Sequence, residues 1–143
     1  MSRILTLLQE ARRRELGQAH FYRVLSGDAE HAGDAAAAER FNELLADEQH
    51  HVARLTARLL ELGGTPQGEG AGPGSVPPLD AWEPEARRRE EDEVTWYEGA
   101  LGGVEDPETR SVLGGILESE RHHRDTLAGK WMPAGPSTFK EDT

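Results

Sequence analysis

The sequence predicts an all-α protein, a four-helix bundle in which one long segment connects the second and third helices. Three observations support this prediction. Leu and Ala dominate the apolar residues of the 143-residue chain, while Val, Ile and Thr are sparse, which favours helix over sheet. Apolar residues recur three and four positions apart in four segments. One Gly- and Pro-rich stretch separates these segments into two pairs. We assign residues 1–130 to a single domain and residues 131–143 to a short C-terminal tail.

The first two predicted helices span residues 3–32 and 34 to about 62. Gly33 separates them, and Asp34 is placed to cap the second. Gly63 and Gly64 end the second helix. Each helix has one face with the spacing of a packed helix. In the first helix this inward face consists of Ile4, Leu8, Ala11, Glu15, Gln18, Tyr22 and Leu25. In the second it consists of Phe41, Leu44, Glu48, His51, Leu55 and Leu62.

Residues 64–80 form the connection between the two pairs. They contain five Gly and four Pro among 17 residues, which excludes regular structure. Fully extended, this segment reaches about 55 Å, whereas the second helix is about 42 Å long. The segment can therefore run the length of a bundle and start the third helix at the same end as the second. A flexible linker between two helical hairpins is the alternative.

The third predicted helix begins near residue 80 or 84 and ends near residue 101. The fourth begins at Pro107, with Asp106 as its cap. The inward face of the third helix consists of Ala86, Glu90, Glu93, Tyr97 and Leu101. That of the fourth consists of Val112, Leu113, Ile116, Glu120, His123 and Leu127. In the tail, Trp131 packs locally or the segment frays.

Composition excludes several classes of function. The net charge of −11 argues against nucleic acid or an anionic membrane as a partner. The absence of cysteine excludes disulfides, thiol catalysis, iron–sulfur clusters and Cys-based zinc sites. No stretch approaches the roughly 20 apolar residues of a membrane span. The first 17 residues do not have the pattern of a secretory signal. We therefore expect a soluble cytoplasmic protein.

The two halves of the chain repeat each other, including polar residues on the inward faces. An offset of 75 brings Glu15 onto Glu90 and Tyr22 onto Tyr97. An offset of 72 brings the pair Glu48 and His51 onto Glu120 and His123. The change of three falls in the loop between helices, where an insertion is best tolerated. Carboxylates and imidazoles repeated among core positions indicate a buried site rather than a surface feature.

Glu-x-x-His within a helix puts both side chains on one face, about one turn apart. Four buried carboxylates without a cation would cost several kcal/mol each. Two divalent metal ions remove this cost, because bridging carboxylates can hold such ions about 3.5–4 Å apart. Mixed oxygen and nitrogen ligands suit iron or manganese, and zinc can bind as well. The sequence therefore predicts a dinuclear metal site.

These motifs resemble those of the ferritin-like di-iron superfamily, and in particular of rubrerythrin-like proteins, over about residues 4–128. The resemblance implies a ferritin-like bundle with two iron ions. In it, Glu15 and Glu90 are terminal ligands, Glu48 and Glu120 bridge, and His51 and His123 each bind one metal. Glu93, three residues after Glu90, resembles the extra glutamate ligand of rubrerythrins. Its alternative is a solvent-facing position in the acidic run "EEDE".

The resemblance also implies a function, namely reduction of peroxide or reaction with oxygen at the dinuclear site. A ferroxidase, a hydroxylase of a small organic substrate and a non-catalytic, metal-stabilised bundle are the alternatives. Many rubrerythrins carry a rubredoxin-like module with four cysteines, which this chain lacks. Turnover would then need a separate electron donor. The family resemblance further implies a homodimer.

For several residues near the predicted ligands, the sequence allows more than one role. Tyr22 and Tyr97 hydrogen-bond a ligating carboxylate or lie near the oxygen-binding site, and core packing is the alternative. His50 and His122 lie about 100° around the helix from the ligand histidines and are expected at the surface or in support of the ligands. The basic runs "ARRRE" and "ARRREEDE" occur at matching places in the two halves. We expect them on exposed helix faces with many ion pairs.

Overall fold

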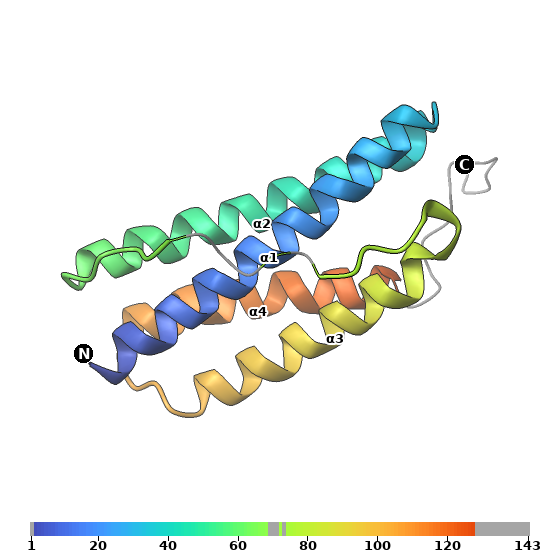
Figure 1. The fold of residues 1–143 in the computed structure, drawn as a ribbon. Helices are drawn as coiled ribbons and strands as arrows, with labels where there is room; N and C mark the ends of the chain where they lie inside the picture. Colours follow the sequence, from blue (N-terminus) through green and yellow to red (C-terminus); the bar gives the residue numbers. More distant parts are fainter. Residues whose placement is uncertain (1, 69–71, 73, 128–143) are drawn as a thin grey trace.

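The computed structural model describes residues 2–68, 72 and 74–127, and this part of the chain forms four α-helices without a strand (Figure 1). The helices are α1 (Arg3–His31), α2 (Ala35–Glu61), α3 (Trp82–Leu101) and α4 (Pro107–Leu127), and a 3₁₀ turn, η1 (Leu79–Ala81), precedes α3. The predicted all-α bundle is confirmed. The domain limit at residue 130 stays a prediction, and the predicted tail with Trp131 lies outside the described residues.

Local capping explains where the helices begin. The side chain of Asp34 accepts a hydrogen bond from the Ala37 N–H at 3.1 Å, and that of Asp106 accepts one from the Thr109 N–H at 3.0 Å. Gly33 ends the first helix with a φ of 75°, a conformation that favours glycine. One predicted inward residue is wrong. Leu62 is 36% exposed, because α2 ends at Glu61 and the chain leaves the helix there.

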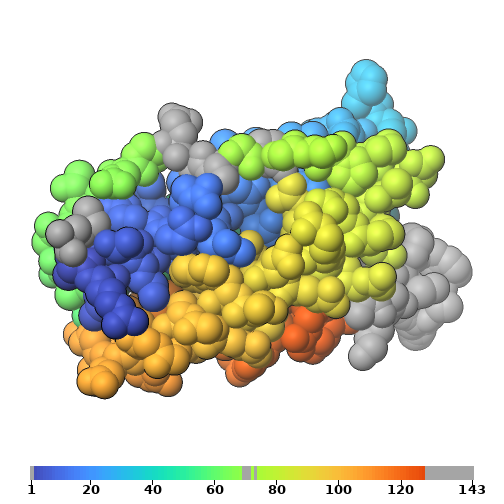
Figure 2. Space-filling model, turned by 60° about the horizontal axis from the view of Figure 1, so that its bottom comes forward, coloured from blue at the N-terminus to red at the C-terminus, as the bar shows by residue number. Residues whose placement is uncertain are grey.

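The described parts of the segment between α2 and α3 lie along the bundle beside α1 (Figures 1 and 2). The Gln9 side chain donates to the Thr65 carbonyl at 2.6 Å, and Arg12 donates to the Gln67 carbonyl at 3.0 Å. Further along, Val76 packs against buried apolar residues. The predicted long crossover is thereby confirmed, and α3 starts at the same end of the bundle as α2. α1 packs chiefly on α2, and α3 on α4.

Two apolar clusters fill the bundle on either side of a polar layer. The first consists of Leu8, Ala11, Leu55, Leu59, Val94, Tyr97, Val104, Leu113, Ile116 and Leu117. The second consists of Phe21, Tyr22, Leu25, Ala29, Ala38, Phe41, Leu44, Trp82, Ala86 and Leu127. In every helix the polar inward residues lie between the stretches that supply the two clusters. The fold thus brings the predicted site residues to one level in the middle of the bundle.

None of the helices in the described part of the chain is long and apolar enough to span a bilayer.

Candidate metal centre

Each helix contributes buried polar side chains to the layer. α1 brings Glu15, and α2 brings Glu48 and His51. These three residues are 0%, 0% and 4% exposed, respectively. α3 contributes Glu90, and α4 contributes Glu120 and His123, which are also buried. The i, i+3 spacing within α2 and within α4 presents carboxylate and imidazole on the same face.

Six of the seven predicted ligands form two overlapping groups. Glu15, Glu48, His51 and Glu120 make the first, called here the Glu15 group. Glu48, Glu90, Glu120 and His123 make the second, the Glu90 group. Within each group, one ligand atom from each residue lies within 4.8 Å of the others. Glu48 and Glu120 belong to both groups, as expected for carboxylates that bridge two metal ions. Glu93 belongs to neither.

Both histidines turn Nδ1 toward the carboxylates. Nδ1 of His51 lies 3.1 Å from Glu15 Oε1 and 3.2 Å from Glu48 Oε1. Nδ1 of His123 lies 3.1 Å from Glu120 Oε1, and 3.6 Å from Glu90 Oε2. The two imidazole centroids are 6.4 Å apart. Nδ1 is therefore the nitrogen of each ring that is placed to bind a metal ion.

The carboxylate oxygens show that the residues fit a pair of cations. Glu48 Oε2, Glu90 Oε1 and Glu120 Oε2 are buried and have no hydrogen-bond partner among the described residues. Leaving charged oxygens buried and unsatisfied is costly, whereas coordination of a divalent ion satisfies them. Carboxylate oxygen with imidazole nitrogen is a ligand set that iron and manganese accept. The geometry supports a dinuclear site, and the role of each ligand stays a prediction.

Protons neutralise the site when metal is absent. Burial, reinforced by the charge of Glu15, raises the pKa of Glu48 to about 8. Burial likewise raises the pKa of Glu120 well above its ordinary value. For His51, burial lowers the pKa, but contacts with the surrounding carboxylates outweigh it and raise the pKa to about 12. The pKa of His123 is raised for the same reason. Metal ions must therefore displace protons to bind.

Two tyrosines hold the predicted terminal carboxylates. The Tyr22 hydroxyl donates to Glu90 Oε2 at 2.6 Å, and the Tyr97 hydroxyl donates to Glu15 Oε2 at 2.7 Å. Burial, followed by the charge of these carboxylates, raises the pKa of both tyrosines well above the ordinary value, so both keep their protons. Each bond crosses between α1 and α3. The structure shows both core packing and the carboxylate hydrogen bond for each tyrosine.

Sequence reasoning missed Asp47, which contacts the outer nitrogen of a ligand histidine. Asp47 Oδ2 lies 2.9 Å from His123 Nε2, and the Asp47 side chain is 55% exposed. The hydrogen bond with His123 lowers the pKa of Asp47, which keeps it charged. Such contacts orient metal-binding histidines. The internal repeat did not indicate Asp47, because the corresponding position in the second half is Ser119. The one indication in the sequence was that Asp47 directly precedes the predicted ligand Glu48.

Sequence reasoning also missed Arg14, whose Nε lies 3.1 Å from Glu93 Oε1. Glu93 is buried, which excludes the alternative prediction that its side chain faces solvent. Burial raises the pKa of Glu93 to about 7, although Arg14 acts to lower it. The expectation of exposed ion pairs in the basic runs holds for Arg13 and Arg88, which pair with nearby acids on their own helices. The expectation is wrong for Arg14, which pairs with Glu93 on another helix. Its position directly before the predicted ligand Glu15 was the one feature of the sequence that could have indicated this role.

Four polar residues that adjoin predicted ligands in the sequence point to solvent. His50 and His122 are exposed, as expected for the surface reading. Glu91 and Asp92, which precede Glu93 in the acidic run, are exposed too. In the paired histidines and in the acidic run, the residues that the helical period predicts to face inward are the ones that are buried in the structure.

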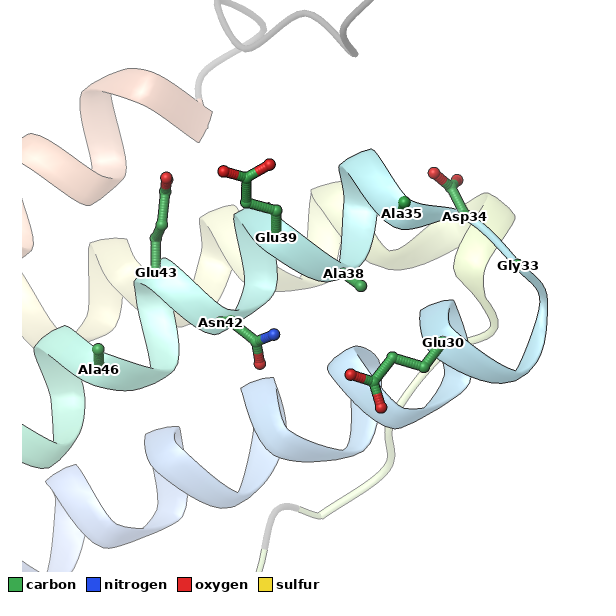
Figure 3. A pocket seen from close by; sticks show the side chains of 9 residues that line it. All are labelled: Glu30, Gly33, Asp34, Ala35, Ala38, Glu39, Asn42, Glu43 and Ala46. Carbon is green, nitrogen blue, oxygen red and sulfur yellow. The ribbon is translucent and has the colours of Figure 1, made fainter.

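A surface groove of about 680 Å³ lies apart from the site, near the turn between α1 and α2 (Figure 3). Glu30 of α1 and Asn42 of α2 lie between the two helices there. The full lining is Glu30, Gly33, Asp34, Ala35, Ala38, Glu39, Asn42, Glu43 and Ala46. It includes no predicted ligand, so the groove is not part of the carboxylate cluster.

Comparison with known proteins agrees with this geometry. The chain matches the sequence model of the Rubrerythrin family over residues 6–130. Among solved structures, Mycobacterium tuberculosis bacterioferritin, BfrA, has a similar fold, with a TM-score of 0.79 and 24% sequence identity. That likeness covers 87% of this chain and 80% of the bacterioferritin, and at this identity it concerns the fold alone. No curated protein sequence matches. Since the family match includes both Glu-x-x-His pairs and all four helices, the chain belongs to the rubrerythrin family of ferritin-like proteins.

Proposed function

We propose that this chain binds two iron ions and reduces hydrogen peroxide at the centre they form. The observation that carries the proposal is the pair of buried four-residue groups that share Glu48 and Glu120. Each group offers three carboxylates and one imidazole. Manganese is the alternative metal, and zinc can occupy the site on purification.

Two ferrous ions held in these groups would supply the two electrons that convert hydrogen peroxide and two protons into two water molecules. The chain contains no cysteine, so it has no cysteine-bound iron of its own to return those electrons. A separate donor protein or a small reductant is therefore part of the proposal.

The tyrosines fix the orientation of the terminal carboxylates. Tyr22 binds Glu90 through Oε2, which leaves the buried Oε1 without a hydrogen-bond partner among the described residues. Tyr97 binds Glu15 through Oε2, which leaves Oε1 facing His51. In both cases one carboxylate oxygen is held by a neutral O–H donor and the other is available inside the cluster. A fixed carboxylate loses less freedom when it binds a metal ion.

Asp47 fixes the ring of His123 for metal binding. Its half-exposed carboxylate accepts a hydrogen bond from Nε2 of the buried His123, whose Nδ1 faces Glu120. The Nε2–H bond to Asp47 leaves the lone pair of Nδ1 for a metal ion and raises the basicity of that nitrogen.

Burial of the ligands favours a small oxidant over an organic substrate. The four shared and terminal carboxylates are fully buried. Hydrogen peroxide and dioxygen are small enough to reach such a site through thermal fluctuations of the helices, whereas an organic substrate would need a cavity beside it. This observation supports peroxide reduction over the hydroxylase alternative.

The proposal is tested by loading metal-free protein anaerobically with ferrous iron and mixing it rapidly with peroxide or with dioxygen. We expect two iron ions per chain and faster oxidation by peroxide. Oxidation by dioxygen alone, followed by uptake of further iron, would replace the proposal with a ferroxidase. Failure to bind iron, or oxidation no faster than that of free iron in either case, would leave a structural bundle.

A further inference from the structure

The side chains around the ligands repeat in the two halves, at the same offset of 75 as the terminal glutamates. Arg14 and Arg89 directly precede Glu15 and Glu90. Arg14 Nε lies 3.1 Å from Glu93 Oε1, while Arg89 donates to Gln18 Oε1 at 3.3 Å. Glu93 is the repeat counterpart of Gln18. The two arginines therefore make the same contact between α1 and α3, in opposite directions.

Aromatic rings complete the match. The Arg14 guanidinium lies 5.2 Å from the Trp96 ring centroid, and the Arg89 guanidinium lies 4.1 Å from that of Phe21. Phe21 and Trp96 are again related by the offset of 75. Both distances are within the range of cation–π contacts. Each guanidinium is thus held between a ring and a polar side chain of the facing helix, and each also lies near a glutamate four residues earlier on its own helix, Glu10 at 3.8 Å and Glu85 at 3.2 Å. Across the two helices, the chief chemical difference is a carboxylate in one half and an amide in the other.

That difference lies beside the proposed centre. Gln18 Nε2 is 3.4 Å from Glu90 Oε2, so it borders a predicted terminal ligand. The repeat puts Glu93 in the corresponding place beside Glu15. Glu93 is 7% exposed and carries a ligand group, yet it is in neither four-residue group. Its Oε1 is engaged by Arg14 instead. Both arginines are charged donors, but an ionised Glu93 adds a Coulomb attraction that the neutral Gln18 amide lacks, so Arg14 holds the Glu93 carboxylate more firmly than Arg89 holds Gln18.

We propose that Arg14 is a positioning residue that holds Glu93, the counterpart of the extra glutamate ligand of rubrerythrins, away from the metal ion of the Glu15 group. The inference rests on the dinuclear site proposed above. Breaking the pair between Arg14 and Glu93 releases a carboxylate next to Glu15, and no equivalent carboxylate exists in the other half. The two metal positions therefore differ in the ligands that they can recruit, although their resident ligands repeat.

The test compares the Arg14→Gln variant with the Arg89→Gln variant, which removes the matching guanidinium beside a neutral amide. Metal-free proteins are titrated with Co²⁺, and binding and coordination are followed by visible absorption and by competition with a chelator. Arg89→Gln measures the effect of losing one nearby positive charge. We expect Arg14→Gln to tighten one Co²⁺ site about tenfold more than Arg89→Gln does, the range of one charge-assisted hydrogen bond. The weaker Co²⁺ absorption of higher coordination should accompany the tightening.

A double substitution separates the role of Glu93 from other effects of Arg14. In a Glu93→Gln background, Arg14→Gln should give no more gain than Arg89→Gln. Equal gains from the two arginine variants, or a gain that persists without Glu93, would overturn the inference. If Arg14→Gln does not fold by circular dichroism, Arg14→Lys replaces it, with a smaller expected gain in the same direction. Wild-type protein that binds no Co²⁺ at all would overturn the proposed centre itself, whereas two bound ions with indistinguishable variants would overturn only the role of Arg14.

Discussion

The overlap of the two ligand groups predicts unequal consequences for glutamates that look alike in sequence. Glu48 lies in both groups, whereas Glu15 lies in one. Glu48→Gln therefore reduces both groups from four ligands to three, and Glu15→Gln reduces one and leaves the other complete. We expect about two metal ions per chain in the wild type, about one in Glu15→Gln and close to none in Glu48→Gln. Glutamine keeps the size of the side chain, so the change is confined to charge and ligand strength.

The fold should survive the substitution of Glu48 in the absence of metal. Burial raises the pKa of Glu48 to about 8, so the metal-free protein already holds this side chain neutral at pH 7. A neutral amide in its place then changes the free energy of unfolding by no more than about 1–2 kcal/mol, the range for one altered hydrogen bond. This makes loss of metal separable from loss of structure.

The assay is elemental analysis after anaerobic loading with ferrous iron and gel filtration, with urea unfolding of the metal-free proteins alongside. Glu91→Gln is the matched control, because Glu91 adjoins Glu90 on α3 but is exposed. It should retain two ions. Retention of two ions by Glu48→Gln, or equal loss in Glu15→Gln and Glu48→Gln, would refute the argument from shared ligands.

Three further predictions follow from the site. In metal-free protein the pKa values of Glu48, about 8, and His51, about 12, lie above those of the unfolded chain, so the folded state binds more protons and the free energy of unfolding should fall as pH rises from about 5 to 8. Urea unfolding in a chelator checks this, and a rise over that range would contradict it. Asp47→Asn should weaken metal binding about 10–100-fold through His123, measured by competition with a chelator, while Ser119→Ala at the repeat position should not. We expect a homodimer, so light scattering should give twice the chain mass, and a monomeric mass would exclude it.

Much of the fold was predictable because its signals are local. Asp34 and Asp106 cap helices through their own neighbours, and Gly33 ends a helix through its own φ. The length of the Gly- and Pro-rich segment alone allowed the crossover. Leu62 was assigned wrongly because the helical period continues through a residue at which the helix has already ended.

The repeat made most of the candidate site predictable as well. Glu48 and His51 share a helix face by the 3.6-residue period, and Glu120 and His123 copy them. Polar residues on a face that must be buried require compensation, so their chemistry could be inferred before the helices were placed.

What the sequence by itself determined is which residues turn inward, with the exception of Leu62, and approximately where each helix begins and ends. Only the tertiary structure decided which inward residues meet. Tyr22 bonds to Glu90 and Tyr97 to Glu15, across two helices, although each tyrosine lies two turns from a glutamate on its own helix. Asp47 reaches His123, and Arg14 engages Glu93, in the same way. These pairings depend on the rotation and axial stagger of one helix against another. Packing of the whole bundle sets both, and no pattern within a single helix encodes them.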